Sequence, residues 1–289
     1  MSKMSIRFYK DREVRAVWDE ENHTWWFAVL DIIAAINSEG SEKARNYWHS
    51  LRARLGDLTQ LGIICTQLKM TANDGKRYNT LVTDNLGISK LAHLIHNKKA
   101  DEFLEWFEYS DKTIDGQSQK KAYLLFDSPI YDQIEVGTVK GLQQIHSFIF
   151  GGLYDFAGKI RTKNIAKGSF QFAPVQFLSQ TLKNIEAMPE TTFDEIIDKY
   201  VEMNIAHPFM EGNGRSTRIW LDLILKKNLK KCVDWSQIEK QSYLDAMKKS
   251  TFDSSEIKEL IKTALTDKIN DREMFMKGVD YSYYYEQPE

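Results

Sequence analysis

The chain has 289 residues, 42% of them hydrophobic and 28% charged, so it is long enough for two domains with packed cores. Its net charge of −2 at pH 7 argues against attraction to nucleic acid or an anionic membrane over the whole surface, although a local basic patch is compatible with it. The cysteines, Cys65 and Cys232, lie far apart, which favours free thiols in a reducing compartment. The N-terminal residues lack the apolar core of a signal peptide, and there is no apolar run of about 18 residues. We therefore expect a cytoplasmic protein without a membrane partner.

Residues 1–110 have the pattern of an α+β domain. Short β-rich runs predict strands at 14–18, 25–30, 63–68 and 78–82. Residues 73–75, Asn-Asp-Gly, are a hairpin signal between the last two runs. Helices are expected at 32–36 after an N-cap at Asp31, to residue 55 after an N-cap at Ser41, to residue 95 after an N-cap at Asp84, and at 100–109. The polar residues 110–120 mark a boundary, so a second domain is expected at 111–289.

Residues 111–289 predict an almost wholly helical domain. Apolar residues spaced i, i+3, i+4 and i+7 predict a helix at 193–205, and another is expected from about Gly214 to residue 225. Asp234 or Ser236 is expected to cap a further helix that runs through residue 247. Residues 161–172 alternate polar and apolar around a Lys-Gly-Ser turn, which predicts a small β-hairpin.

The segment 207–218, His-Pro-Phe-Met-Glu-Gly-Asn-Gly-Arg-Ser-Thr-Arg, lies between two of the predicted helices. His207 titrates near neutrality and can take a proton from an attacking hydroxyl. Glu211 can hold Mg²⁺, the usual partner of nucleotide phosphates. The segment therefore carries a base and a metal ligand for the chemistry of a phosphorus group.

The same segment has the parts of an anion site. Gly212 and Gly214 on either side of Asn213 let successive backbone N–H groups point into one concavity. A helix that starts at the second glycine adds its positive end. Arg215 and Arg218 are three residues apart and share one face of the first turn. A tight turn with surface arginines is the alternative interpretation.

This segment resembles the signature of the Fic family, H-x-F-x-[D/E]-G-N-G-R-x-x-R, at every fixed position, and the resemblance extends over about residues 112–289. It implies an all-α Fic bundle with a small β-hairpin flap, and an enzyme that transfers AMP from ATP to a hydroxyl of a target protein. It also implies the role of each site residue. The general base is His207, the magnesium ligand is Glu211, the phosphate cradle is Gly212, Asn213 and Gly214, and the arginines for the outer phosphates are Arg215 and Arg218.

Other residues take roles from the same resemblance. The hairpin turn Lys167, Gly168 and Ser169 becomes a flap that pairs with the extended backbone of the target, and an ordinary surface hairpin is the alternative. Tyr243 falls where relatives wall the nucleoside, and a core tyrosine is the alternative. Relatives with lysine at the position of Gly214 act as kinases, so this glycine favours nucleotidyl transfer. Transfer of UMP or phosphocholine, and removal of AMP, stay open.

The C-terminal residues 282–286, Ser-Tyr-Tyr-Tyr-Glu, resemble the inhibitory motif [S/T]-x-x-x-E-[G/N] of the self-inhibited class of the family. Ser282 and Glu286 are four residues apart and share a helix face. The resemblance implies that Glu286 pairs with Arg218 and disfavours productive ATP binding. Gln287 departs from the motif, and an amphipathic tail is the alternative. In this class the resemblance also points to a type II topoisomerase as target and to homo-oligomers.

Residues 13–108 resemble the BRO amino-terminal domain of phage antirepressors, through the runs 14–22, 25–33, 46–48 and 84–88. That resemblance implies DNA binding. Residues 43–77 hold seven basic and two acidic side chains, a net charge of +5, whereas 1–110 as a whole has 15 of each. A protein-interaction or oligomerisation module is the alternative. For the whole chain, the alternative to an enzyme is a phage-derived DNA-binding regulator whose Fic part is vestigial or serves assembly.

Overall fold

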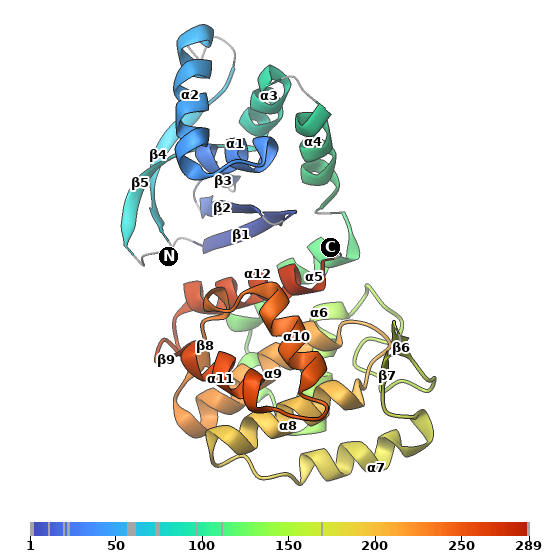
Figure 1. Ribbon diagram of the computed structural model, residues 1–289. Helices are drawn as coiled ribbons and strands as arrows, with labels where there is room; N and C mark the ends of the chain where they lie inside the picture. The colour runs from blue at the N-terminus through green and yellow to red at the C-terminus, as the bar shows by residue number, and fades with distance from the viewer. Residues whose placement is uncertain are drawn as a thin grey trace. The chain divides into compact units, whose positions relative to one another are not determined.

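The computed structural model describes residues 3–10, 12–19, 21, 24–56, 62–72, 76–95, 98–110, 112–168 and 170–287. It divides between Thr113 and Ile114 into two compact units, Met1–Thr113 and Ile114–Pro288 (Figure 1). Among the described residues, no helix is long and apolar enough to cross a membrane.

The first unit is built on an antiparallel sheet with strand order β1-β2-β3-β5-β4. Its strands are β1 (Lys3–Tyr9), β2 (Arg12–Asp19), β3 (Thr24–Ala28), β4 (Cys65–Thr71) and β5 (Arg77–Thr83). Its helices are α1 (Val29–Asn37), α2 (Ser41–Leu55), α3 (Asn85–Ile95) and α4 (Lys98–Ser110). Apolar side chains of all four helices join those of the strands in one core, which includes Ile32, Trp48 and Phe103. The described part of this unit is therefore α+β.

Several local predictions for this unit need correction. The sequence pattern did not indicate β1, and α1 begins at Val29 within the run predicted as a strand. Asp31 is not an N-cap, because its carboxylate accepts hydrogen bonds from the backbone and the guanidinium of Arg15. Gly40, and not Ser41, is the N-cap of α2. The cap at Asp84 is confirmed, since its Oδ1 accepts from Gly87 N at 2.8 Å. The predicted turn at 73–75 lies outside the described residues.

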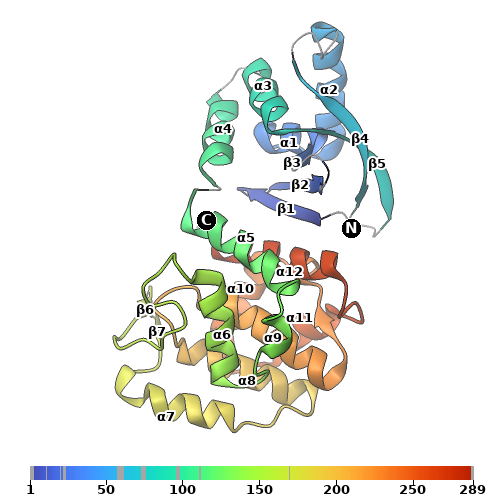
Figure 2. The same ribbon diagram turned by 180° about the vertical axis from the view of Figure 1, so that it is seen from behind.

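The second unit is a helical bundle with two very short ladders (Figure 2). Its helices are α5 (Ile114–Phe126), α6 (Val139–Phe150), α7 (Val175–Glu186), α8 (Phe193–Ala206), α9 (Asn213–Leu229), α10 (Lys240–Lys249), α11 (Ser255–Thr263) and α12 (Arg272–Glu286), with 3-10 turns η1 (Tyr131–Gln133) and η2 (Trp235–Gln237). The ladders pair β6 (Ala166–Lys167) with β7 (Phe170–Gln171) and β8 (Cys232–Val233) with β9 (Leu265–Thr266).

Helix α9 is the central helix of the bundle, because it packs against α6, α8 and α12 (Figures 1 and 2). Its side chains are buried on nearly every face as far as Leu225, as expected for a helix surrounded by others. Helix α8 begins with a capping box formed by Thr192 and Glu195. The bundle thus fixes both helices that flank the segment 207–218.

One capping prediction in this unit is wrong. Asp234 caps the 3-10 turn η2, where its Oδ1 accepts from Ser236 N. Glu239 instead caps α10, through bonds from the N–H groups of Gln241 and Ser242. The short turn between them could not be distinguished from the start of a long helix by spacing alone.

Candidate active site

The loop between α8 and α9 is held in shape by its own side chains. The C-cap of helix α8 is His207, whose φ of 49° is left-handed and whose N–H donates to Met203 O at 3.0 Å. The side chain of Asn213 then closes the loop, because it donates to Phe209 O and accepts from Phe209 N, each at 2.8 Å. The side chain of Asn213 is thus used to shape the loop, and its backbone N–H is one of those that precede the helical bonds of α9.

The start of α9 is the segment predicted to form an anion cradle. Gly212 has a φ of 79°, and a Cβ there would lie 2.4 Å from the Phe150 ring, so no other residue fits without displacing that ring. The first helical bond runs from Ser216 N to Gly212 O at 3.1 Å. The N–H groups of residues 213–215 therefore precede the ladder of helical bonds and lie at the positive end of the helix.

The imidazole of His207, the predicted general base, is held in a neutral form. Its Nδ1 lies 3.1 Å from Asn204 O, and a carbonyl can only accept, so the proton is assigned to Nδ1 and Nε2 keeps its lone pair. The ring of Phe172 stacks on the imidazole with centroids 3.7 Å apart. Burial lowers the pKa of His207 to about 4, so the imidazole is neutral at pH 7.

Arg218 is buried, and two of its three nitrogens are bonded to the C-terminal helix. Its Nε donates to Ser282 Oγ at 2.7 Å, and its Nη2 donates to Ser282 O at 2.9 Å and to Glu286 Oε1 at 2.5 Å. Burial opposes the charged form of Glu286, but Arg218 outweighs it, and the pKa of Glu286 is lowered. The structure thus brings together both residues of the C-terminal motif and the second arginine of the segment.

Arg215 lies between two aromatic rings, with its guanidinium carbon 5.0 Å from the Phe150 centroid and 5.3 Å from that of Tyr283. Its Nη2 donates to Glu211 Oε1 at 2.9 Å, and its Nη1 donates to the carboxylate of Asp115 on α5. Both arginines of the segment are therefore paired with carboxylates.

The middle of this unit matches a known family. Residues 137–225 match the sequence model described as the Fic/DOC family. The chain contains a Fic domain. The match covers α6, the hairpin, α7, α8 and most of α9, and so includes the loop that carries His207.

Curated relatives of the Fic domain are named as adenylyltransferases. The chain is 27% identical over 210 residues to "Protein adenylyltransferase VbhT" of Bartonella schoenbuchensis, an alignment that covers 68% of this chain and 39% of that protein. It is 26% identical over 141 residues to "Probable protein adenylyltransferase y4lH" of Sinorhizobium fredii, covering 44% of this chain and 73% of that one. The chain thus spans well under half the length of VbhT.

Solved Fic structures are more distant. The Fic domain of a Bartonella effector protein from Bartonella sp. AR 15-3 is 16% identical, with a TM-score of 0.47, and covers 54% of this chain and 83% of its own. The BepC protein of Bartonella tribocorum, solved with bound AMPPNP, is 18% identical, with a TM-score of 0.44, and covers 53% of this chain and 84% of its own.

The flap of the Fic domain has the predicted hairpin pairing, Ala166 with Gln171 and Lys167 with Phe170. Gly168 supplies a φ of 59° at its turn. The ammonium of Lys167 lies 3.9 Å from Glu286 Oε2, so the flap also faces the C-terminal helix. Ser169 lies outside the described residues.

Tyr243 is a core residue of the second unit. Its hydroxyl lies 2.6 Å from that of Tyr200 and accepts from Arg218 Nη1 at 3.2 Å. Its ring stacks on that of Tyr285, with centroids 4.8 Å apart. The structure therefore places Tyr243 in contact with Arg218, with one face of its ring covered by Tyr285 of α12.

Glu211 has the chemistry of a single-carboxylate magnesium ligand. Its Oε1 accepts from Gly212 N at 2.9 Å and from Arg215, and its side chain is 58% exposed. In the described part of the chain, no three His, Cys, Asp or Glu side chains gather to hold a metal. One carboxylate fits Mg²⁺ that is held mainly by water and nucleotide phosphates, as this ion prefers.

Two supporting residues of the Fic domain were missed by the sequence patterns. Arg161 is buried, and its guanidinium donates to the carbonyls of His207, Ala206, Lys163 and Ala173, so it ties both ends of the flap to the candidate base. No spacing rule identifies an arginine that binds backbone carbonyls 46 positions away.

The second is His146 on α6, whose Nδ1 accepts from Gly158 N at 2.9 Å. Its Nε2–H therefore donates to Glu211 O at 2.9 Å, and its ring stacks on Phe209 at 3.8 Å. Burial lowers the pKa of His146 to about 4, so this neutral form persists at pH 7. Its only signal in the sequence was its inclusion in the stretch that resembles the family.

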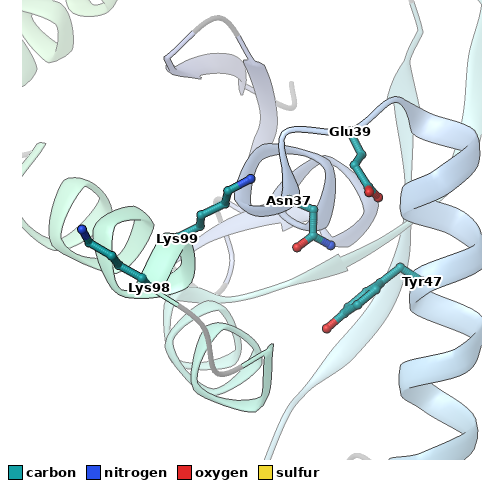
Figure 3. A pocket seen from close by; sticks show the side chains of 5 residues that line it. All are labelled: Asn37, Glu39, Tyr47, Lys98 and Lys99. Atoms are coloured by element: carbon teal, nitrogen blue, oxygen red, sulfur yellow. The ribbon is translucent and has the colours of Figure 1, made fainter.

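The first unit contains a separate shallow cavity of about 470 Å³, lined by Asn37, Glu39, Tyr47, Lys98 and Lys99 (Figure 3). Figure 3 shows the ammonium of Lys98 directed away from Asn37 and Tyr47. None of the residues of the segment 207–218 lines it, so it is not part of the Fic site.

Proposed function

We propose that the Fic domain is a protein adenylyltransferase that Glu286 holds inactive. The observation that carries the proposal is the neutral imidazole of His207 shortly before the N-terminus of α9, with Arg215 and Arg218 in the first two turns of that helix. The names of two relatives support the reaction class. Label transferred from α-labelled ATP to protein by a Glu286→Gly chain tests it, and absence of label would contradict it.

The residues divide the reaction between them. The target hydroxyl oxygen bonds to the α-phosphorus of ATP, the bond to the bridging α–β oxygen breaks, and pyrophosphate leaves with the electron pair. The hydroxyl proton passes to Nε2 of His207. The N–H groups of residues 213–215 and the two arginines stabilise charge on the phosphates. Glu211 would hold Mg²⁺, which neutralises phosphate charge when bound.

Glu286 supports self-inhibition because it occupies the guanidinium group that an outer phosphate needs. A Cβ at Gly214 would lie 2.1 Å from Glu286 Oε1 and 3.0 Å from Arg218 Nη2, so the carboxylate fills the space above this glycine. A phosphate that enters here must displace it. Gly214 also leaves room for a nucleotide in the orientation for AMP transfer, once the carboxylate is removed.

The target is proposed to present its hydroxyl along the flap, where Lys167 and Phe170 are exposed. A type II topoisomerase, named by the resemblance of the sequence, is the first target to test. Self-association of the chain, which the same resemblance implies, is testable by light scattering as a function of protein concentration.

The pH profile of transfer tests the role of His207. Because the pKa of this imidazole is about 4, the base stays neutral and active from pH 8 down to about 6, and protonation removes it only as pH falls towards 4. Transfer by the Glu286→Gly chain should therefore be nearly constant between pH 6 and 8. Circular dichroism at each pH controls for unfolding. Half-loss near pH 6.5, the value of an unperturbed histidine, would contradict a buried base.

We further propose that the first unit binds DNA through α2. Four cations of this helix are exposed, Lys43, Arg45, Arg52 and Arg54, beside one exposed acid, Glu42. The cations form two pairs on opposite sides of the buried face, Lys43 with Arg54 and Arg45 with Arg52, and contact with phosphates requires only such a local excess of cations. The same observation would also suit an acidic protein partner, which the next experiment separates.

A gel-shift assay at low salt should show binding that Arg52→Ala with Arg54→Ala weakens. The slope of log affinity against log salt should fall by about 2, because two phosphate contacts are lost. Lys98→Ala with Lys99→Ala removes the same charge from α4 and should leave the slope nearly unchanged. No shift with the parent chain at low salt would exclude DNA. A shift without any AMP transfer by Glu286→Gly would favour the DNA-binding regulator.

A further inference from the structure

A second carboxylate from outside the segment 207–218 reaches its arginines. Asp115 lies in the first turn of α5 and accepts a hydrogen bond from Arg215 Nη1, 100 positions away in the sequence. The side chain of Asp115 is 64% exposed, whereas that of Arg215 is only 4% exposed. This contact is separate from the pair formed by Arg218 and Glu286.

Each terminal nitrogen of Arg215 donates a hydrogen bond to a carboxylate. Nη1 is bonded to Asp115 and Nη2 to Glu211, while its buried Nε has no hydrogen-bond partner among the described residues. The rings of Phe150 and Tyr283 also lie against the guanidinium, with centroids 5.0 and 5.3 Å from its carbon. Each terminal nitrogen still carries a second N–H, but a phosphate that binds this arginine must share the cation with both carboxylates.

Of the two carboxylates bonded to Arg215, Asp115 is the one whose only effect on a bound phosphate would be obstruction. Glu211 belongs to the same loop and can turn to Mg²⁺, so its exchange accompanies nucleotide binding. Asp115 adds a negative charge that faces the same guanidinium and would repel a phosphate group. Its removal leaves Arg215 with Glu211 and both aromatic rings, so the arginine keeps its place.

Helix α5 is fastened to the C-terminal helix that carries Glu286. Tyr283 on α12 donates to Ser118 Oγ at 2.9 Å, and Gln119 donates to Asp280 Oδ1 at 2.8 Å. Two packed helices thus direct one carboxylate each at the two arginines of the anion site. Displacement of Glu286 alone leaves the contact on Arg215 in place.

We propose that Asp115 is a second internal competitor for the nucleotide, and that it lowers affinity for the outer phosphates by occupying Arg215. This inference rests on the proposed function only in so far as ATP is the ligand of the site. It predicts a selective effect on nucleotide affinity. ATP and ADP carry outer phosphates that compete with Asp115, whereas AMP has only the α-phosphate.

Calorimetric titration of the full chain with Mg²⁺ tests the proposal. In the Glu286→Gly background, Asp115→Asn keeps the size of the side chain and removes its charge. It should tighten binding of ATP and ADP by about three- to tenfold, a modest range because Asp115 is largely exposed. Binding of AMP should stay within about twofold. The matched control is Asp132→Asn, which removes an exposed acid of η1 from the same unit.

The outcomes are distinct. Tighter ATP and ADP with unchanged AMP supports the proposal. Equal affinities in Asp115→Asn and Asp132→Asn, or an equal gain for all three nucleotides, overturns it. Weaker ATP would make Asp115 a residue that positions Arg215, which also overturns it. If the chain binds ATP but transfers nothing, the proposed function fails while the competition measurement still stands.

Discussion

The Glu286→Gly chain is expected to transfer AMP at least about tenfold faster than the parent chain, a typical size for coupling between an inhibitory contact and a ligand. Loss of the carboxylate frees Arg218 Nη2 and opens the space above Gly214. The buried guanidinium then keeps its bonds to Ser282 but lacks a counter-charge, which the outer phosphates of ATP can supply. Initial rates with labelled ATP measure the effect.

A second variant separates charge from helix fraying. Glycine also weakens the last turn of α12, whereas Glu286→Gln keeps the turn and removes only the charge. Both variants should be activated, and both should lose about 2 to 3 kcal/mol of unfolding free energy, which ATP should partly restore. Rates equal to that of the parent in both variants would remove the inhibitory role of this residue.

The second large effect is expected from His207. In the Glu286→Gly background, His207→Ala should lower transfer by about 10²- to 10⁴-fold, the usual contribution of a general base. Binding of ATP should stay within about threefold, because the arginines and the start of α9 remain in place. Rates and calorimetric affinities measured on the same preparations check both parts.

The matched control for this prediction is His93→Ala, which removes an exposed histidine of α3. Its rate should equal that of the Glu286→Gly chain. If His207→Ala transferred AMP as fast as this control, the proton would go elsewhere and the assigned role of the imidazole would be wrong.

The central features of the candidate site could be predicted because they are local in sequence. The apolar spacing of 193–205 predicted α8, and the pattern from Gly214 to residue 225 predicted most of α9. The spacing of four between Ser282 and Glu286 likewise placed both on one face, and both contact Arg218. Each of these features depends on residues within about one or two helical turns.

The remaining features arise from packing between distant segments. Asp115, Arg161 and His146 act through contacts with elements far along the chain, which no periodicity encodes. Tyr243 could not be assigned between core and nucleoside site, because its position depends on stacking with Tyr285 of another helix. In the first unit, the sequence pattern predicted Asp31 as a helix cap, whereas its carboxylate accepts a hydrogen bond from the distant Arg15.

The most direct test compares two labels in ATP. The Glu286→Gly chain, incubated with Mg²⁺ and a bacterial cell extract, should label protein from α-labelled ATP and not from γ-labelled ATP. The same label should disappear when the Glu286→Gly chain also carries the substitution His207→Ala. Label from the γ-phosphate alone would show phosphoryl transfer. No label from either ATP would show an inactive site. Either result would contradict an adenylyltransferase.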